Sequence, residues 1–80
     1  FNMDVTIEKI LDIVRKTDSQ IDDSILTPNA VLTKIGADSL DMMNIFVELD
    51  SVLGYVVPDE DIDNLLSVQD IYEYAINKKN

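Results

Sequence analysis

The sequence predicts an all-α domain: a small four-helix bundle of three main helices and one short helix, with a long ordered first loop. Apolar residues recur at helical spacing in three separate segments, and no segment alternates apolar and polar residues as a half-buried strand does. Gly54 and Pro58 divide the second half of the chain, as residues that end and start helices. The 80 residues, 46% of them hydrophobic, are enough for one small core, so we expect a single domain over residues 1–80.

The first helix is predicted over residues 4 to 17. Its apolar residues follow the i, i+3, i+4, i+7 spacing of a helix with one buried face: Ile7, Ile10, Leu11 and Val14. Asp4 or Thr6 is available as its N-cap. We interpret residues 1–2 of this domain, which stand before Met3, as an added remnant.

The connection over residues 17–37 is rich in Asp, Ser and Thr, yet it is too apolar for a disordered linker. Six apolar residues recur along it: Ile21, Ile25, Leu26, Val31, Leu32 and Ile35. We therefore predict a packed loop with a short helical turn near Pro28.

The second helix is predicted from Ser39 to Leu53, with Gly54 as its C-terminal cap. The three residues that follow should be extended because they lead into Pro58. Pro58 in turn suits the first turn of a short helix over residues 59–64.

The last helix is predicted to start at Ser67, where Asp70 three residues later makes an approximate capping box. Its apolar stripe is formed by Val68, Ile71, Tyr72, Ala75 and Ile76. Residues 77–80 are predicted to form a polar tail.

The second helix carries two apolar stripes. With about 100° per residue, one stripe is a core face: Met42, Ile45, Phe46, Leu49 and Leu53. The other lies nearly opposite: Leu40, Met43 and Val47. One helix of a small bundle cannot easily bury both stripes, so we expect the second to be an exposed docking surface. The alternative is that the long loop folds over it.

Composition excludes several classes of function. The chain has no cysteine and no histidine, which excludes disulfides and thiolate metal sites and fits a cytoplasmic protein. Its net charge of −10 at pH 7 disfavours binding to nucleic acid or anionic lipid. No apolar run approaches the ~20 residues that span a membrane, and no secretion leader is visible. The charge favours either basic partners or simple solubility, and we expect a monomer.

Ser39 stands between Asp38 and Asp41 at the start of the second helix. A nucleophilic serine needs a base that a third group orients, and no histidine is present to serve, so catalysis by this chain is not expected. Ser39 is either a helix cap or, if Asp38 caps, a free hydroxyl. A phosphate attached to a free hydroxyl there would meet the amides and positive end of the helix. A modification site is therefore physically reasonable.

The residues around Ser39 resemble a known motif. Gly-Ala-Asp-Ser-Leu-Asp at 36–41 resembles the phosphopantetheine attachment motif of acyl carrier proteins. Val-Pro-Asp-Glu-Asp at 57–61 resembles the segment that leads into the third helix of that family, and Ser-Val-Gln-Asp at 67–70 resembles the start of its fourth. The resemblance covers nearly the whole chain, including helix order, spacing and acidity.

The resemblance implies a carrier rather than an enzyme. Ser39 would bear 4′-phosphopantetheine from coenzyme A, attached by a separate phosphopantetheinyl transferase, and Asp38 matches the acid beside the serine. The thiol of the arm would hold growing or finished acyl chains as thioesters, in fatty acid biosynthesis or a related dedicated pathway. The other implied partners are acyl-transferring and synthase enzymes with basic docking patches.

The resemblance also implies roles for two further sets of residues. Those at partner-docking positions are Leu40, Asp41, Met43, Val47 and Asp50. Those where the family lines its acyl pocket are Phe46, Leu49, Val57, Ile62 and Leu65. Each of the second set would also be an ordinary core residue.

Alternatives remain at this stage. Asn44, Ser51 and Val52 stand where fatty-acid carriers usually have acids, which leaves open a specialised carrier for polyketide or nonribosomal-type or other acyl transfer. A different class is a non-carrier acidic interaction module or a divalent-cation-binding module. Residues 59–63 alternate acids like a calcium loop, but Asn64 stands where that loop needs glycine and Asp70 where it needs glutamate. We therefore predict no metal site.

Overall fold

The computed structural model, which describes residues 5–17 and 20–78, is built from helices joined by turns and loops. The elements in chain order are α1 (Ile7–Thr17), the 3₁₀ turn η1 (Leu32–Lys34), α2 (Ser39–Leu53), α3 (Asp59–Ile62) and α4 (Val68–Lys78). No strand occurs in the described ranges. The predicted all-α bundle of three main helices and one short helix is confirmed.

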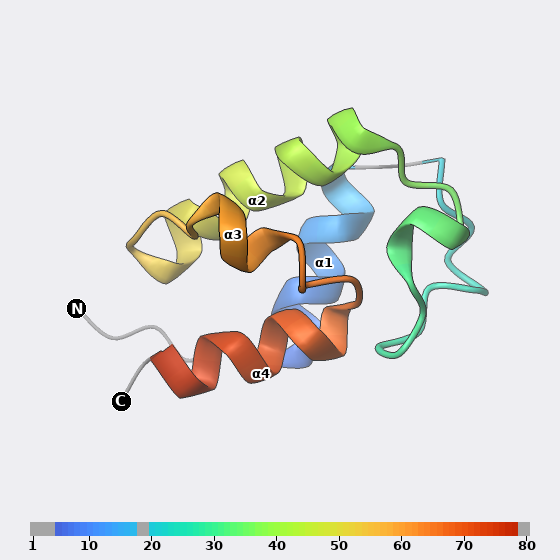
Figure 1. Cartoon of the computed structure of the whole chain (residues 1–80). Coiled ribbons are helices and arrows are strands. Elements are labelled where there is room, and N and C mark those ends of the chain that lie inside the picture. The colour runs from blue at the N-terminus through green and yellow to red at the C-terminus, as the bar shows by residue number, and fades with distance from the viewer. Residues whose placement is uncertain (1–4, 18–19, 79–80) are drawn as a thin grey trace.

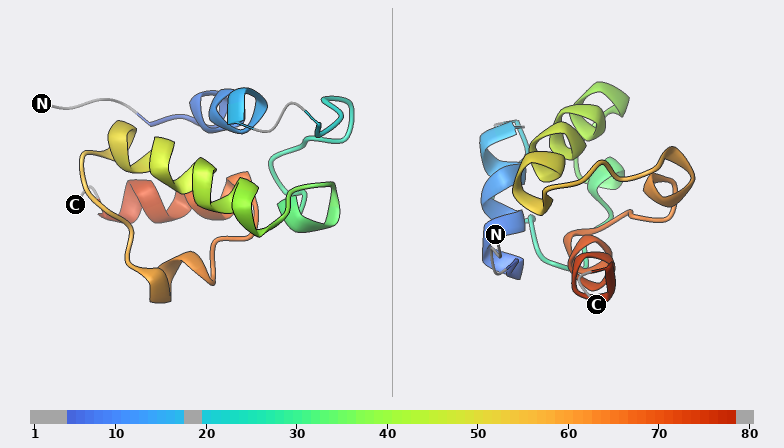
Figure 2. Two further views of the ribbon diagram at one scale, coloured as in Figure 1. Left: turned by 90° about the horizontal axis from the view of Figure 1, so that it is seen from above. Right: turned by 90° about the vertical axis from the view of Figure 1, so that its left-hand side faces the viewer.

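The helices form three levels. α2 and α4 lie at the middle level, with α1 on one side and α3 on the other, as both views of Figure 2 show. α1 packs against both α2 and α4, and α3 lies between α2 above and α4 below in the view of Figure 1. In the part of the chain that the structure describes, no helix is long and apolar enough to cross a membrane.

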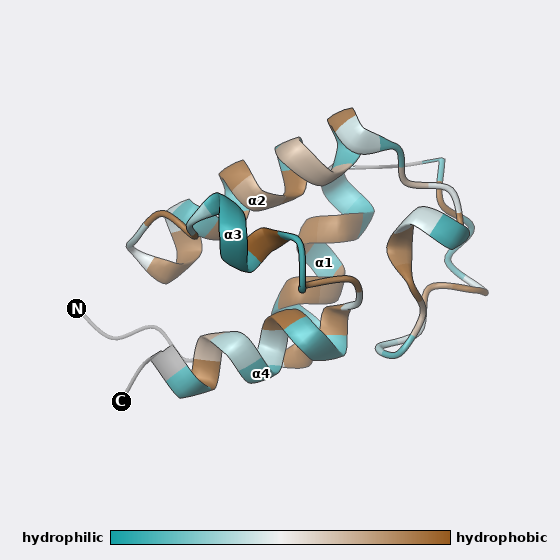
Figure 3. Ribbon diagram, viewed as in Figure 1, coloured by the Kyte–Doolittle hydropathy of each residue, from teal (hydrophilic) through white to brown (hydrophobic). Residues whose placement is uncertain are grey.

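The core lies where α1 meets the middle level. Its fully buried side chains come from every main helix and from η1: Ile10, Val14, Leu32, Ile45, Leu49, Val68 and Ile71. The hydropathy colouring shows apolar and polar positions interleaved along α1 and α4, as expected for helices with one buried face (Figure 3).

The predicted start of α1 at residue 4 is wrong. Val5 and Thr6 are not helical, and the Thr6 hydroxyl oxygen accepts a hydrogen bond from the Lys9 amide at 3.1 Å. Thr6 is therefore the N-cap, because its side chain satisfies an amide that lacks an intrahelical partner. Asp4 and the supposed remnant at residues 1–2 lie outside the described residues.

The long first loop is packed, as predicted. Ile21, Leu26 and Leu32 are buried. The backbone ties the loop to the start of α4, because the Gln69 amide donates to the Pro28 oxygen at 2.8 Å and the Leu32 amide donates to the Leu66 oxygen at 2.9 Å. The expected helical turn near Pro28 is misplaced. Pro28 lies in an ordinary turn, and the helical turn follows at η1, where Leu32 is fully buried.

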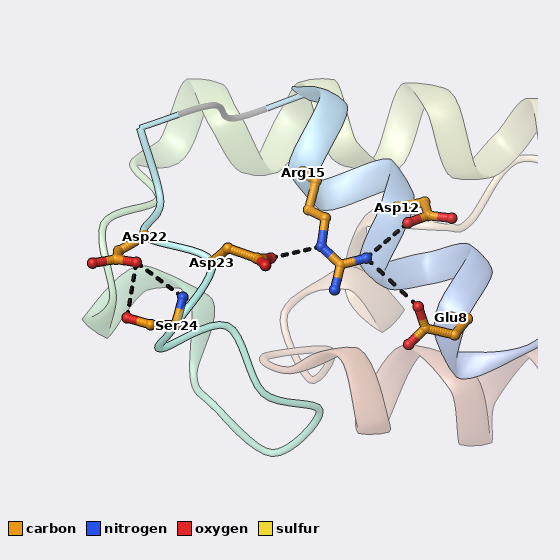
Figure 4. Close-up of polar contacts among 6 residues, drawn as sticks. All are labelled: Glu8, Asp12, Arg15, Asp22, Asp23 and Ser24. Carbon is orange, nitrogen blue, oxygen red and sulfur yellow. Dashed lines mark hydrogen bonds and ion pairs between the residues drawn. The ribbon is translucent and has the colours of Figure 1, made fainter.

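Arg15 connects α1 to this loop (Figure 4). Its Nε donates to Asp23 Oδ1 at 2.7 Å, and its Nη1 lies 2.7 Å from Asp12 Oδ1 and 3.6 Å from Glu8 Oε1. The hydrogen bond to Asp23 and then that to Asp12 raise the pKa of Arg15 above its ordinary value.

Asp22, beside this ion-pair cluster, organises the neighbouring turn (Figure 4). Its Oδ1 accepts the Ser24 amide at 2.9 Å and the Ser24 hydroxyl at 2.8 Å. These two bonds, the one from the amide first, lower the pKa of Asp22. An aspartate that accepts from the residue two positions later is a common turn-forming arrangement.

The helix ends follow from local chemistry. Gly54 has φ +82° and its amide donates to the Asp50 oxygen at 2.9 Å, a left-handed cap that glycine adopts without strain. α3 ends at Ile62, earlier than predicted, because the next amides turn back to oxygens only three residues away. α4 continues to Lys78, so the first half of the predicted polar tail is helical; residues 79–80 lie outside the described residues.

The N-terminus of α4 departs slightly from a capping box. The Ser67 hydroxyl accepts from the Asp70 amide at 3.1 Å, as predicted. The Asp70 carboxylate, however, accepts from the Leu66 amide at 3.1 Å and so reaches one residue further back than a capping box requires.

Candidate functional site

Ser39 is the first residue of α2, and the residue before it caps the helix. Asp38 has extended backbone, and its Oδ1 accepts from the Asp41 amide at 2.9 Å. Asp41 Oδ2 accepts in return from the Asp38 amide at 2.9 Å, which completes a capping box. Asp38 therefore does the capping, and Ser39 is exposed with no hydrogen bond from its hydroxyl to any described residue.

Two amides of the first turn of α2 remain available near Ser39. The first intrahelical bond runs from the Met42 amide to the Asp38 oxygen at 3.0 Å, and the Asp41 amide is held by Asp38. The amides of Ser39 and Leu40 precede that bond, so they have no carbonyl partner within the helix. They are the donors that a phosphate on the Ser39 hydroxyl would meet.

The chain reaches Ser39 through a fixed approach. Gly36 has φ +129°, a conformation that side-chain-bearing residues rarely adopt, and the Ala37 amide donates to the Leu32 oxygen at 3.0 Å. Ala37 is buried. The serine is thus held on a rigid corner between η1 and α2.

A groove of about 500 Å³ begins at Ser39 and follows α2. Its α2 side is formed by Ser39, Met42, Met43, Phe46, Val47 and Asp50. Its other side comes from Thr33 of η1, from the loop before α3, from α3 and from the residues after it: Val56, Val57, Asp59, Ile62, Asp63, Leu65 and Leu66. The eleven helical steps from Ser39 to Asp50 extend for about 16 Å at helical rise, so the groove follows most of the length of α2.

Four of the five predicted acyl-pocket residues meet in this groove. Phe46, Val57, Ile62 and Leu65 line it. Leu49 does not, because it is fully buried in the core. Met42 lines the groove and was assigned only to the core, although it lies four residues before Phe46 on the same helix. Thr33, Val56 and Leu66 belong to turns and loops, and no periodic signal marks them.

The second apolar stripe of α2 is exposed. Leu40, Met43 and Val47 are 64%, 67% and 65% exposed, so the alternative in which the long loop covers them is wrong. Met43 and Val47 also form one rim of the groove. A partner that rests on this stripe would therefore touch the groove as well.

The two acids predicted to meet partners also have structural contacts. Asp41 belongs to the capping box. Asp50 is half-buried, and its Oδ1 accepts from the Val57 amide at 3.1 Å, which fixes the loop between α2 and α3. Within the described ranges, no cluster of three or more acids is placed to hold a metal ion.

Comparisons with known proteins agree with this geometry. A family model described as "Phosphopantetheine attachment site" matches residues 8–75. The chain is 36% identical over 72 residues to an acyl carrier protein of Syntrophobacter fumaroxidans, covering 89% of this chain and 88% of that one. It is 29% identical over 70 residues to an acyl carrier protein of Campylobacter hominis, covering 88% and 89%. It is 36% identical over 77 residues to acyl carrier protein 1, chloroplastic, of Casuarina glauca, covering 92% and 57%.

Proposed function

Because the chain belongs to the acyl carrier protein family, a family of carriers and not enzymes, we propose that Ser39 is the residue that bears its 4′-phosphopantetheine cofactor. The observation that supports this most strongly is that Asp38 and Ser39 have different roles at the start of α2. Asp38 caps the helix, and the neighbouring Ser39 hydroxyl is exposed and without a partner among the described residues. The phosphodiester of the arm would accept from the amides of Ser39 and Leu40.

The experiment is a mass measurement with matched serine variants. The unmodified protein is incubated with coenzyme A and a broad-specificity phosphopantetheinyl transferase. We expect the mass to rise by one phosphopantetheine group in the wild type and in Ser51→Ala, because Ser51 is exposed on the same helix but far from its N-terminus. Ser39→Ala should show no gain. A gain that survives Ser39→Ala would refute the assignment.

We further propose that the groove along α2 receives the acyl chain and the arm that carries it. The groove begins at Ser39, its walls are largely apolar, and its volume lies in the range of small-molecule sites. An acyl chain bound there should stabilise the fold, because a ligand bound only by the native state raises stability. Loading with octanoate should therefore raise the melting temperature more than loading with acetate.

The groove variant is Ile62→Ser, which makes the middle of one wall polar. It should reduce the difference in melting temperature between the octanoyl-loaded and acetyl-loaded proteins. Ile25→Ser, at an exposed position of the first loop, is the control and should leave the difference intact. Equal melting temperatures for both loaded forms of the wild type would contradict binding in the groove.

The partners we propose are the transferase and acyl-transferring and synthase enzymes with basic docking patches. They would rest on Leu40, Met43 and Val47, whose exposed side chains form an apolar strip. The net charge of −10 would accelerate encounter with basic surfaces at low salt. We also propose a cytoplasmic monomer.

The pathway we propose is fatty acid biosynthesis or a related dedicated pathway. A specialised carrier is the second candidate, favoured by Asn44 and Ser51, which are exposed on α2 and carry no charge. Mass spectrometry of the protein isolated with its native acyl group distinguishes the two, since a simple saturated chain supports the first and a branched, aminoacyl or polyketide group supports the second.

A further inference from the structure

A polar cluster lies where the loop after α2 meets α3 and α4. It consists of the Tyr55 hydroxyl from the loop, the Asp61 carboxylate from α3 and the Tyr74 hydroxyl from α4. The Tyr74 hydroxyl donates to Asp61 Oδ2 at 2.7 Å. Burial first, and then the charges of Asp50 and Asp61, raise the pKa of Tyr55, so its hydroxyl lies within electrostatic range of both carboxylates.

The cluster adjoins the end of the groove that is farthest from Ser39. Asp50, the last α2 residue of the groove, is one of the two acids near the Tyr55 hydroxyl. Tyr55 and Tyr74 also line a smaller pocket of about 300 Å³ together with Val56, and Val56 lines the groove as well. An acyl chain that is attached through Ser39 and runs along α2 therefore approaches the cluster with its distal end.

The Tyr55 hydroxyl is the member of the cluster that the fold leaves unsatisfied. It is buried and has no hydrogen-bond partner in the described part of the chain. Both nearby carboxylates already accept from other donors. Asp61 accepts from Tyr74, and Asp50 Oδ1 accepts from the Val57 amide at 3.1 Å. Because a buried hydroxyl without a partner costs free energy, an acceptor brought by the acyl chain would be favoured here over a methylene group.

The charge around the cluster limits what that acceptor can be. Asp50, Asp59 and Asp63 line the groove, and Asp61 belongs to the cluster. Among the described residues, no lysine or arginine lines the groove or the smaller pocket. A carboxylate at the distal end of the chain would be repelled by these acids. The oxygen of a ketone or a hydroxyl group carries no charge, and it can accept from the Tyr55 hydroxyl.

We propose that this carrier holds acyl chains with a neutral oxygen, as a ketone or a hydroxyl group, in their distal half, and that the Tyr55 hydroxyl donates a hydrogen bond to that oxygen. Tyr55 is then a specificity-determining residue, because a site built to hydrogen-bond an oxygen disfavours the analogue that lacks it. The inference deepens the proposed function and rests on it in one respect, namely that the groove holds the acyl chain.

The first test uses the unmodified protein, so that it does not depend on that function. Tyr55→Phe removes the hydroxyl and keeps the ring. It should leave the melting temperature unchanged or raise it, because no hydrogen bond is lost. Tyr74→Phe removes a bond to a carboxylate and should lower the melting temperature by several degrees. If Tyr55→Phe lowered it as much as Tyr74→Phe does, the Tyr55 hydroxyl would already have a partner, and the proposal would fail.

The second test compares four chains of equal carbon number on the wild-type protein: octanoyl, 7-oxooctanoyl, 3-oxooctanoyl and 7-carboxyheptanoyl. The 7-oxooctanoyl form should melt roughly 4–8 °C above the octanoyl form, the shift that one neutral hydrogen bond gives in a domain of this size. The other two should melt no higher than the octanoyl form, because one has its extra oxygen beside the thioester and the other ends in a charge. A 7-oxooctanoyl form no more stable than the octanoyl form would overturn the proposal. An equal gain for 3-oxooctanoyl would overturn it too.

Two tyrosine variants assign the gain to one hydroxyl. Tyr55→Phe should abolish the difference in melting temperature between the 7-oxooctanoyl and octanoyl forms. Tyr72→Phe is the matched control, since Tyr72 is also a half-buried tyrosine packed against the core, and it should keep the difference. With ¹³C at the ketone, the infrared carbonyl band should lie at lower frequency in the wild type than in Tyr55→Phe. A gain or a band position that survives Tyr55→Phe contradicts the hydrogen bond.

The outcomes separate this inference from the proposed function. Failure of the transferase to load Ser39, or equal melting temperatures of the octanoyl and acetyl forms, would refute the proposed function. The first test would still decide whether the Tyr55 hydroxyl lacks a partner. If the octanoyl form is more stable than the acetyl form and the distal ketone adds nothing, the groove holds the chain without selection by Tyr55, and this inference alone fails.

Discussion

Asp38 and Asp41 each accept a hydrogen bond from the other's backbone amide, both at 2.9 Å. This reciprocal pair begins α2 with the residue before Ser39 and not with Ser39 itself. Had Ser39 been the cap, its hydroxyl would be turned to the Asp41 or Met42 amide and unavailable for modification. The exposed hydroxyl is therefore a consequence of having two capping residues side by side.

Replacing Asp38 with alanine should lower the free energy of unfolding by about 1 kcal/mol, because the Asp41 amide loses its acceptor. For a domain of this size, the melting temperature should fall by roughly 4–8 °C. Thermal unfolding followed by circular dichroism measures the change. Asp38→Asn, which keeps an acceptor oxygen, should be close to the wild type. Equal stability of Asp38→Ala and the wild type would mean that Ser39 can cap in its place.

Replacing Met43 with glutamate should impair transfer between partner enzymes by roughly tenfold or more, because an apolar anchor of the docking stripe becomes charged. The fold should survive, since Met43 is 67% exposed and surface substitutions change stability by about 0.5 kcal/mol or less. Transfer rates and thermal unfolding are measured on the same sample. Asn44→Glu adds the same charge to an exposed position off the stripe and should have a much smaller effect. If both changes lowered the transfer rate to a similar degree, the loss would come from the added charge and not from the apolar stripe.

The helices and the exposed stripe could be predicted because they follow from spacing along one helix. Leu40, Met43 and Val47 lie nearly opposite Ile45 and Leu49 at helical pitch, and the structure buries the second pair and exposes the first three. The caps at Gly54 and Ser67 could likewise be predicted, because a glycine ends one helix and a serine begins another through local chemistry.

The groove could be predicted only in part, since spacing does not separate its wall from the core. Met42 and Leu49 lie about 20° apart on the helix, yet Met42 lines the groove and Leu49 is fully buried. The difference depends on where α3 lies, and a contact between residues distant in the chain, Asp61 with Tyr74, helps to fix that. The hydrogen bond from the Val57 amide to Asp50 could not be predicted for the same reason, because it depends on how the loop after α2 folds back.

Replacing Arg15 with alanine should loosen the first loop with little change in global stability, because exposed ion pairs contribute little to the free energy of unfolding. The loop should respond because Arg15 holds Asp23 at 2.7 Å. Faster hydrogen exchange at the Ser24 amide, which Asp22 accepts, is the expected result. Lys16→Ala removes an equal charge at the next position and should leave that amide unaffected. The difference in Ser24 exchange rate between the two variants should shrink at high salt, where exposed charges are screened. If the difference persists, contacts other than this ion pair hold the loop.

Stability should fall at alkaline pH between pH 10 and about 12, and Tyr74 should account for part of the loss. The pKa of Tyr74 is raised from its ordinary value of 10 to about 12, by burial first and then by its bond to Asp61. Over that interval the unfolded chain releases the phenol proton while the folded chain keeps it. The unfolded state then binds fewer protons, so unfolding becomes more favourable as pH rises. The stabilisation is complete below pH 10 and is lost as pH passes through about 12.

Urea unfolding measures this loss. Between pH 10 and about 12 the free energy of unfolding should decline less steeply for Tyr74→Phe than for the wild type, and below pH 10 the two proteins should show parallel curves. Tyr55, whose pKa is also raised, should contribute its own share, so Tyr55→Phe should flatten the remaining decline. If stability declined equally steeply in Tyr74→Phe and in the wild type above pH 10, the Tyr74 hydroxyl would lose its proton as readily in the folded chain as in the unfolded one.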